Sequence, residues 1–584
     1  MSDGPLGLYI PLRGAATRGT TKVRIGCVDN RADEIRSSAF PTLTDDQIEF
    51  LRHYGEVRKI EPGEVLFREG DRPYDFIVIL EGEVKIIENF AGEARTITVH
   101  GAGRFLGELN MLTGQSVYLS AVVRESGQVL AIPPQHLKKI ITEEPTLSDI
   151  ILKAFLMRRS VLMRVGTGLR IVGSRHSRDA LRLREFAVRN RLPHAFIDLE
   201  EDERAEALLE RFDVKPQETP VAIWLGDKVL KNPTNTELAR AVGLDVDTSG
   251  EHTYDLVVVG AGPAGLAATV YGASEGLSTL ALEAVALGGQ AGTSSRIENY
   301  LGFPAGLSGS ELAARALVQV GKFDARTTVP QEAVGLRREN GCYIVTLSEG
   351  GEVAAHSIIV ATGARYRRPT VPRLEEFEGV SVHYAATEAE AQMCRGNEVA
   401  VVGGGNSAGQ AAVFLASRVA KVYLLIRGGD LGKSMSRYLI DRIETTENIE
   451  LLAHTEVREL LGEDRLDGIL VEDNRSGERC TLTTKALFVF IGAEANTGWL
   501  EGTVELDERG FILTGRPLDR FALESSVWRE LSRQPYLLET SLPGVFAAGD
   551  VRGSSIKRVA SAVGEGSMAV RFVHQYLAEA SAPA

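Results

Sequence analysis

A strand that leads directly into a glycine-rich turn and then a helix occurs twice in this chain, and no other feature constrains the fold as strongly. In the first copy, Asp255-Leu256-Val257-Val258-Val259 precedes Gly260-Ala261-Gly262-Pro263-Ala264-Gly265. The first glycine permits the tight turn, the second lets the backbone approach a pyrophosphate, and the third lets helix and strand pack closely. Glu283 ends the next strand, where an acid takes ribose hydroxyls. The pattern predicts a dinucleotide-binding βαβ unit.

The second copy has the same order of elements but differs in the residue that ends its second strand. Glu398 to Val402 lead into Gly403-Gly404-Gly405-Asn406-Ser407-Ala408, and the next predicted strand, 421–426, carries no acid and runs into Arg427. Arginine suits a 2′-phosphate, so NADPH is favoured over NADH, with Lys433 as a second cation. If Arg427 is merely solvated, NADH stays possible. Two such fingerprints, 143 residues apart, predict two dinucleotides and hydride transfer between a nicotinamide and a flavin.

Composition excludes several classes of protein. The chain of 584 residues has 65 basic and 79 acidic side chains, a net charge of −14, and no long basic run, which argues against nucleic acid as a partner. Its four cysteines, at positions 27, 342, 394 and 480, include no close pair. A disulfide-stapled domain, a cysteine zinc site and a Cys-x-x-Cys redox centre are therefore excluded, and no metal site is predicted.

The sequence shows no signal for export or membrane insertion. The first 40 residues lack the apolar core of a signal peptide. Two uncharged stretches, 256–274 and 399–417, approach the length of a membrane helix, but a glycine cluster interrupts each one directly after a β-branched run. We interpret both as buried strands turning into helices, and expect a cytoplasmic protein without a membrane partner.

The remaining patterns divide the chain into domains. Residues 41–145 show short alternating strands at a spacing typical of a β-sandwich or barrel, and a helix is predicted over 147–164. Residues 169–244 alternate strands and helices as a small α/β unit. The predicted boundaries are 1–40 (flexible arm), 41–165, 168–245, 246–253 (linker), 254–366 together with 490–584, and 367–489.

Residues 254–584 resemble the low-molecular-weight thioredoxin reductases and their relatives. The resemblance rests on seven segments in the family's order, the last of them a tripeptide, Arg558-Val559-Ala560, like the one beside the flavin ring. The other six are Gly260 to Gly265, Gly288-Gly289-Gln290, Ile297-Glu298-Asn299-Tyr300, Ala361-Thr362-Gly363, Gly403 to Ala408, and Gly544-Val545-Phe546-Ala547-Ala548-Gly549-Asp550.

This resemblance implies FAD held by 254–366 and 490–584, a nicotinamide domain inserted between them, and a homodimer. Asp550 would bond the ribityl chain of the flavin, and Asn299 and Gln290 would lie near the ring. The implied FAD residues are Gly260, Gly262, Pro263, Ala264, Gly265, Glu283, Gly289, Gln290, Asn299, Thr362, Gly363, Gly549, Asp550, Arg558, Val559 and Ala560. The implied NADPH residues are Gly403, Gly405, Asn406, Ser407, Ala408, Arg427 and Lys433.

One departure from the family pattern changes the expected chemistry. Thioredoxin reductases carry a Cys-x-x-Cys upstream of the second fingerprint, and the nearest alignment places Ala385 and Glu388 at those positions. Transfer of electrons to a protein disulfide needs one thiol to attack and one to resolve. The remaining candidates for shaping an acceptor site are His383, Tyr384 and Glu388.

The two N-terminal domains resemble known modules that lack their functional residues. Residues 168–245 resemble a glutaredoxin/thioredoxin fold, with Thr219-Pro220 at the cis-proline position and serines replacing both cysteines in Ser174-Arg175-His176-Ser177. Residues 41–165 resemble a cyclic-nucleotide-binding β-roll in which Glu108 takes the ribose hydroxyl. Val117 and Tyr118 stand where that family has its phosphate-binding arginine, so cyclic AMP or GMP binding is disfavoured.

The expected fold class is therefore a multidomain α/β protein: a β-roll, a thioredoxin-like α/β domain and a flavoprotein fold with two Rossmann-like dinucleotide-binding domains. Three functions are compatible with it. The first is an enzyme that passes hydride from NADPH to FAD and electrons on to quinone, oxygen, free flavin or a small electron-transfer protein. The second is a non-catalytic sensor of NADPH and flavin redox state, and the third is a thioredoxin-disulfide reductase that uses a partner's cysteines.

Overall fold

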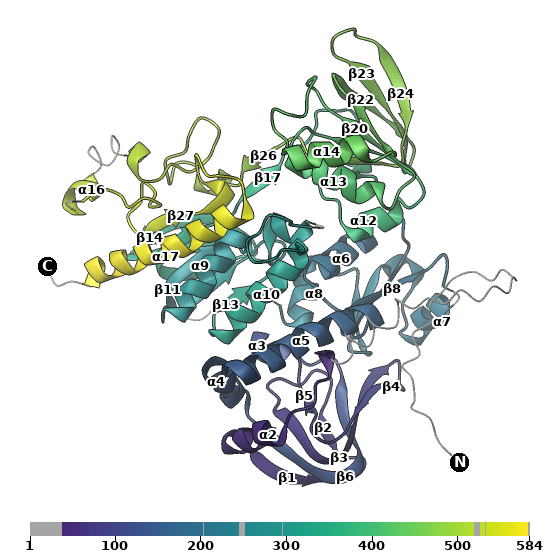
Figure 1. Cartoon of the computed structure of the whole chain (residues 1–584), viewed down its shortest axis with the longest axis vertical. Helices are drawn as coiled ribbons and strands as arrows, with labels where there is room; N and C mark the ends of the chain where they lie inside the picture. The colour runs from purple at the N-terminus through teal and green to yellow at the C-terminus, as the bar shows by residue number, and fades with distance from the viewer. Residues whose placement is uncertain are drawn as a thin grey trace, which may run out of the picture. The chain divides into compact units, whose positions relative to one another are not determined.

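The computed structural model describes residues 38–202, 204–244, 252–294, 296–518, 526–531 and 533–581. Most of the predicted N-terminal arm, most of the predicted linker and Cys27 lie outside these ranges. The chain forms two compact units, one made of residues up to 174 together with 191–243, the other of 175–190 together with 244–584 (Figure 1). Each unit is described separately below.

An antiparallel six-stranded sheet opens the first unit. Its strand order is β1-β6-β3-β4, and β2 and β5 pair with β6 and β3. Strand β3 begins with four consecutive buried residues, Phe76 to Ile79, and alternates only in its second half, where Val84 and Ile86 are buried and Lys85 and Ile87 are partly exposed. The strands are β1 (Glu56–Ile60), β2 (Val65–Phe67), β3 (Phe76–Phe90), β4 (Glu93–His100), β5 (Phe105–Leu106) and β6 (Ser120–Ile132).

Helices precede and follow this roll. The helix predicted over 147–164 is α5 (Pro145–Val165), which starts at a proline in its first turn and ends at Gly166, whose φ is +66°. Proline has no N–H to lose at that position, and glycine tolerates the left-handed conformation that ends the helix. The other helices here are α2 (Asp45–Leu51), α3 (Asn110–Thr113) and α4 (Pro134–Glu143).

A second sheet in the same unit has the order β10-β9-β7-β8, with β7 and β8 parallel and the other pairs antiparallel. The Thr219-Pro220 peptide bond is cis, as predicted. Its strands are β7 (Leu169–Gly173), β8 (His194–Asp198), β9 (Val221–Trp224) and β10 (Lys228–Lys231), and its helices are α7 (Arg204–Arg211) and α8 (Asn235–Val242). The intervening helix α6 (Arg178–Arg189) belongs to the second unit.

The second unit is built on a seven-stranded sheet of order β13-β12-β11-β16-β15-β14, with β27 beside β16. Strand β11 is central and parallel to both neighbours, so its valines are buried on both faces. The strands are β11 (Thr253–Val259), β12 (Thr279–Leu282), β13 (Arg326–Thr328), β14 (Ala333–Glu339), β15 (Cys342–Leu347), β16 (Glu352–Val360) and β27 (Val545–Ala547).

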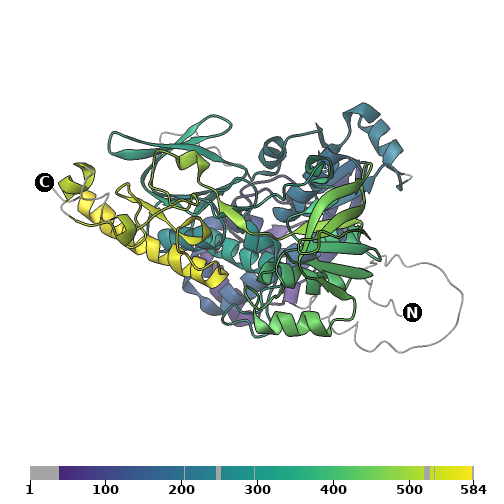
Figure 2. The ribbon, with the colours of Figure 1, turned by 90° about the horizontal axis from the view of Figure 1, so that it is seen from above.

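Helices made largely of small residues cover this sheet. Helix α9 (Pro263–Ser274) is buried along much of its length, and alanine and glycine there allow α10 (Gly309–Lys322) and the long α17 (Val559–Ser581) to pack against it. Figure 2 shows α17 in yellow as one continuous helix. The first glycine turn therefore lies between the sheet and the C-terminal segment of the chain.

A five-stranded parallel sheet of order β18-β25-β19-β20-β21 carries the second glycine turn. A separate two-stranded ribbon consists of β17 (Ala364–Tyr366) and β26 (Ala493–Ala495). The strands are β18 (Val382–His383), β19 (Glu398–Val402), β20 (Lys421–Leu425), β21 (Ile449–Leu452) and β25 (Ala486–Val489), the helices are α11 (Leu374–Phe377), α12 (Glu388–Met393), α13 (Asn406–Ala416) and α14 (Arg437–Thr445), and an antiparallel sheet adds β22 (Thr455–Gly462), β23 (Leu466–Asp473) and β24 (Arg479–Thr483).

The predicted fold class is confirmed for the β-rich N-terminal roll and for the two dinucleotide-binding sheets, while the domain boundaries stay predictions. Within the described ranges, no helix combines the length and the apolar character that crossing a bilayer requires. The stretches 256–274 and 399–417 are instead the strand–turn–helix units β11–α9 and β19–α13.

Candidate functional site: two glycine turns

Two glycines of the first turn are required by the protein's own packing. Gly260 has a φ of +99°, and a methyl group on it would lie 2.4 Å from the carbonyl oxygen of Ala361. A methyl group on Gly265 would lie 1.7 Å from the carbonyl oxygen of Gly260. Any side chain at either position would displace backbone, so both glycines explain how β11 turns into α9.

Gly262 is different, because nothing in the chain itself requires a glycine there. It caps α9 with ordinary extended backbone, and a methyl group would come no closer than 3.9 Å to another atom, the Cα of Gly289. The corresponding Gly405, which caps α13, has no atom within 4 Å of such a methyl group. Each turn thus keeps open space at a helix N-terminus, where amide donors and the helix dipole favour a phosphate, so both turns fit a dinucleotide.

Segments far apart in sequence meet at the first turn. The Gly288 N–H donates to the Ala261 carbonyl at 2.8 Å, which places Gly289 beside Gly262. A methyl group on Gly549 would lie 2.9 Å from the Ala264 Cβ, so the C-terminal motif also reaches this turn. The structure thereby brings together the predicted FAD residues of the first fingerprint, Gly289, Thr362 and Gly549.

Glu283 lies beneath the first turn and is buried. Its Oε2 accepts the Ala261 N–H at 2.8 Å, and its Oε1 accepts the N–H groups of Val285 at 3.0 Å and Ala286 at 3.3 Å. Burial raises the pKa of this carboxyl group, and the backbone donors oppose that shift. The predicted ribose ligand therefore also fixes the turn, a role that the sequence pattern does not reveal.

The other predicted FAD residues differ in how firmly the protein holds them. The Gln290 amide donates to the Ala364 carbonyl, and the Thr362 hydroxyl donates to the Asn496 carbonyl at 2.8 Å. Asp550 is partly exposed, and burial raises the pKa of its carboxyl group. Asn299, Arg558 and Ala560 are exposed, and Gly363 and Val559 are partly exposed. Pro263 is the first residue of α9, and Val559 is the first residue of α17.

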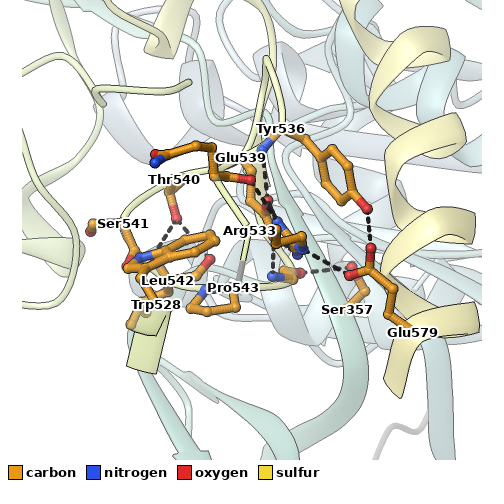
Figure 3. A network of polar contacts seen from close by, with 12 residues as sticks. Ser357, Trp528, Arg533, Tyr536, Glu539, Thr540, Ser541, Leu542, Pro543 and Glu579 are labelled. Atoms are coloured by element: carbon orange, nitrogen blue, oxygen red, sulfur yellow. Dashed lines mark hydrogen bonds and ion pairs between the residues drawn. The ribbon is translucent and has the colours of Figure 1, made fainter. Parts of the chain in front are cut away.

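A buried ion-pair network holds the segment that precedes the Gly549-Asp550 motif (Figure 3). The fully buried Glu539 carboxylate accepts from Arg533 at 2.7 Å and from the Gly544 N–H at 2.8 Å. Arg533 also pairs with Glu579 of α17 at 2.7 Å, and the Tyr536 hydroxyl donates to the same carboxylate at 2.5 Å. The network therefore ties the loop before β27 to the helix that follows the motif.

The loop that follows β20 is hydrogen-bonded to the second turn. A methyl group on Gly403, where φ is +142°, would lie 2.2 Å from the Phe490 carbonyl oxygen. The Ser434 hydroxyl donates to the Gly404 carbonyl at 2.9 Å, and the Ser436 N–H donates to Asn406 Oδ1 at 2.7 Å. These two serines were missed by the sequence reasoning; the run Ser434-Met435-Ser436, just past the predicted cations, is the only signal for them.

The remaining predicted NADPH residues lie on this turn and loop. Arg427 and Lys433 are exposed, and the Arg427 carbonyl accepts from the Asn474 amide at 3.0 Å. Ser407 is exposed and Ala408 is buried under the turn. Both cations therefore lie at the surface, and a guanidinium group such as that of Arg427 suits a phosphate.

The three candidate acceptor-site residues do not form one cluster. His383 is buried in β18, and burial lowers the pKa of its imidazole to about 4. Tyr384 donates to Glu378 at 2.6 Å and stacks on Tyr366, with ring centroids 6.3 Å apart. Glu388 is exposed and pairs with Arg418 at 2.8 Å.

Tyr366 is a residue that the sequence reasoning missed. It follows the Ala361-Thr362-Gly363 segment in β17, and burial raises the pKa of its phenol, with Thr293 and Asp550 among its neighbours. Tyr366 therefore links Tyr384, on which it stacks, to segments that carry predicted FAD residues.

The three cysteines in the described ranges are unpaired. Cys394 is buried, which raises the pKa of its thiol to about 12, and Cys480 is exposed. The Cys342 sulfur lies 3.6 Å from His356 Nδ1. Nowhere in the described part of the chain do three or more His, Cys, Asp or Glu side chains gather in a way that suits a metal ion.

Comparisons with known proteins agree with this geometry. The family model described as pyridine nucleotide-disulphide oxidoreductase matches residues 254–566, and the model described as cyclic nucleotide-binding domain matches 57–144. Solved thioredoxin reductases from Lactococcus lactis (26% identity) and T. acidophilum (28%) each match with a TM-score of 0.50, over 56% and 57% of this chain and all of theirs.

Curated relatives match over a similar span. NADPH-dependent thioredoxin reductase 3 of Arabidopsis thaliana is 32% identical over 370 residues, which is 60% of this chain and 65% of that protein. A component of the alkyl hydroperoxide reductase of Pseudomonas putida is 33% identical over 339 residues, 58% of this chain and 60% of that protein. The chain thus spans less than two thirds of the length of these curated relatives.

Proposed function

The chain belongs to the pyridine nucleotide-disulphide oxidoreductase family, and from this premise we propose that it is an FAD-dependent NADPH oxidoreductase that delivers electrons to an external acceptor. The observation that carries the proposal is the pair of open glycine turns: Gly262 and Gly405 leave space that the chain's own packing does not use. FAD and NADPH are the cofactors. The chemistry that bound FAD supplies is hydride acceptance from a nicotinamide and onward electron transfer.

The chain's own residues bind and orient these groups. Gly262 and the N-terminus of α9 would take the flavin pyrophosphate, and Glu283 the ribose hydroxyls, because its carboxylate has further lone pairs beyond its backbone bonds. Gly405 and the N-terminus of α13 would take the nicotinamide pyrophosphate, with Arg427 and Lys433 on the 2′-phosphate. The other residues that were predicted to bind FAD are proposed to contact the rest of the flavin.

The acceptor is proposed to be external because the chain has no pair of cysteines to carry electrons further. Ala385 and Glu388 stand at the positions expected for such a pair, and Cys394 is a buried thiol of raised pKa. A thiolate is the reactive form of cysteine, so burial makes Cys394 unreactive. Quinone, oxygen, free flavin or a small electron-transfer protein are the acceptors that fit. The stacked Tyr366 and Tyr384 are proposed to shape their site, and His383 and Glu388 remain the other candidates.

We assign the N-terminal regions supporting roles. The domain at 168–245 is proposed to be a thioredoxin-like module that cannot cycle a disulfide, since Ser174 and Ser177 replace its cysteines. The β-roll is proposed not to bind ordinary cyclic nucleotides, because Val117 and Tyr118 offer no charge to a phosphate. We also propose that the protein is a homodimer and that it is cytoplasmic.

The deciding experiment mixes the purified protein anaerobically with NADPH, then separately with NADH, and follows flavin absorbance. Bleaching is expected with both, and faster with NADPH. If neither bleaches the flavin, the enzyme proposal is wrong. A flavin that is reduced but reoxidised slowly by quinone, oxygen and ferredoxin alike, with a large conformational change, would instead favour a redox sensor.

A second experiment tests the role of thiols. The variant in which all four cysteines are replaced by serine should keep its rate of NADPH oxidation with a quinone. Activity towards an aromatic disulfide is expected to be low in both proteins. High disulfide activity that disappears in the serine variant would contradict the proposal of an external, thiol-independent acceptor.

A further inference from the structure

The β-roll contains a partly open cavity of about 70 Å³. Since one water needs roughly 10–15 Å³ of such space, this cavity equals about five waters, the size of a single substituted ring. Most of its wall is apolar. Among the residues that line it are Phe67, Ile86, Ile97, Leu106, Val117 and Leu119.

Three buried polar atoms at this cavity have no hydrogen-bond partner in the described part of the chain. They are Glu108 Oε2, His100 Nδ1 and the Tyr74 hydroxyl, on side chains that are 7%, 3% and 8% exposed. The other oxygen of Glu108 accepts the Tyr118 N–H at 3.2 Å, which fixes the carboxyl group in place. Buried polar atoms normally find a partner, so these three indicate an occupant that can hydrogen-bond.

The cavity offers no free charge to a ligand. Glu108 and the buried guanidinium of Arg158 both line it and interact electrostatically with each other, so their charges offset one another. Arg158 is also committed to the protein, because it donates to the carbonyls of Ala39 at 2.8 Å and Gly107 at 2.6 Å and lies 4.5 Å from the ring centroid of Phe105. Burial lowers the pKa of His100 to about 3, so its imidazole is neutral.

A cyclic phosphate finds no cation where the family pattern puts one. Val117 presents an alkyl side chain to the cavity, and Tyr118 turns its ring onto Trp224, with centroids 5.3 Å apart. Arg159, which lies over the Tyr118 ring, donates to Asn110 at 3.2 Å and Gln115 at 3.3 Å. The polar groups of this pocket are therefore arranged for a hydrogen-bonding group rather than for a phosphate.

We propose that the β-roll cavity binds a small uncharged phenol or cyclic alcohol, whose ring fills the apolar space and whose hydroxyl hydrogen-bonds to Glu108 Oε2. This site is separate from the proposed NADPH and FAD sites, since every residue that lines it belongs to the first unit. It assigns the β-roll a ligand class different from cyclic nucleotides.

Calorimetry on the full-length, flavin-loaded protein tests the proposal with 4-methylphenol and cyclohexanol as probes. Both should bind with one site per chain, and benzoate, benzylamine and cyclic AMP should bind at least about tenfold more weakly, because each brings a charge into a buried site. If neither neutral probe binds at millimolar concentration, the cavity holds only water and the proposal is wrong. Tighter binding of cyclic AMP would equally overturn it.

Two variants locate the binding in the cavity. Val117→Phe fills the space and should abolish binding while flavin content stays unchanged. Val161→Ala, on α5, enlarges the space and should let 2-naphthol bind where the unmodified protein excludes it. If Val117→Phe fails to fold, the 2-naphthol result decides. Binding that both variants leave unchanged would place the probe elsewhere and contradict the assignment.

Discussion

At the scale of single residues, Gly262 and Gly265 show that one residue type serves two purposes within a single turn. Gly265 is needed by the protein, since a methyl group there would overlap the Gly260 carbonyl oxygen, whereas the space beside Gly262 is open. Gly262→Ala should therefore leave the fold intact and lower bound flavin about tenfold or more, because the methyl group would occupy the pyrophosphate position. Absorbance of the purified protein measures this.

The matched control for that experiment is Gly265→Ala. Overpacking at this position should lower the free energy of unfolding by about 1–3 kcal/mol, with or without FAD. A Gly262→Ala protein that retains full flavin, or that unfolds as readily as Gly265→Ala, would contradict the assignment of the open space to a cofactor.

Arg427 determines, on our proposal, which nicotinamide is preferred. Arg427→Ala should raise the KM for NADPH about tenfold, since one charge-assisted phosphate contact is lost, and leave the KM for NADH nearly unchanged. Lys433→Ala should act in the same direction with a smaller effect. Equal changes for the two nucleotides would show that Arg427 contacts no 2′-phosphate.

Glu108 links protonation to stability. Burial raises the pKa of its carboxyl group from 4.5 to about 7, against the opposing influence of Arg159, the Tyr118 N–H and Arg158. The folded state then binds more protons than the unfolded state between these values, so the favourable contribution is full below pH 4.5 and is lost as pH rises to about 7. The loss amounts to about 3 kcal/mol, since one pKa unit is worth ~1.4 kcal/mol.

Glu108→Gln removes this titration. Urea unfolding at pH 5 and at pH 8 should therefore show that the unmodified protein loses stability relative to the variant on going to the higher pH. The lowered pKa of His100 is common to both proteins and cancels in the comparison. A difference that is the same at both pH values would mean that Glu108 ionises normally.

At the scale of elements, the buried pair of Arg533 and Glu539 holds the loop before β27 (Figure 3). Arg533→Met would leave the Glu539 carboxylate buried without its partner, and should lower the free energy of unfolding by about 3–5 kcal/mol. Because β27 leads into Gly549-Asp550, flavin should also dissociate more readily. Chemical denaturation and flavin release measure the two effects.

Arg337→Met is the control, since it removes an exposed ion pair with Glu352 in the same sheet. Such surface pairs contribute about 0–1 kcal/mol, so little should change. Similar losses in the two variants would show that the network around Glu539 has no special role in holding this segment.

The extent to which elements were predictable follows from their local signals. Strand β19 has the predicted bounds, because its β-branched run ends at a glycine turn. Helix α5 extends one or two residues beyond its prediction at each end, where Pro145 and Gly166 provide the start and stop. Tyr366, Ser434 and Ser436 could not be assigned to a site, because only contacts between distant segments give them their place.

At the scale of the whole molecule, the family resemblance predicts a homodimer. Sedimentation of the flavin-loaded protein should give twice the chain mass of 63.2 kDa. Dilution into the nanomolar range should not dissociate the dimer, since obligate interfaces are large and apolar. A monomer at micromolar concentration would contradict this prediction.

The sequence by itself determined the two strand–turn–helix units and the family, and it predicts the loss of the redox-active cysteine pair and of the phosphate-binding arginine of the β-roll. These features are local in the chain or depend on which residue types are present. Only the tertiary structure decided that Gly262 and Gly405 face open space, that Glu283 holds the first glycine turn, that Tyr366 stacks on Tyr384, and that the β-roll contains a cavity. These depend on which distant segments pack together, and packing is a property of the folded chain.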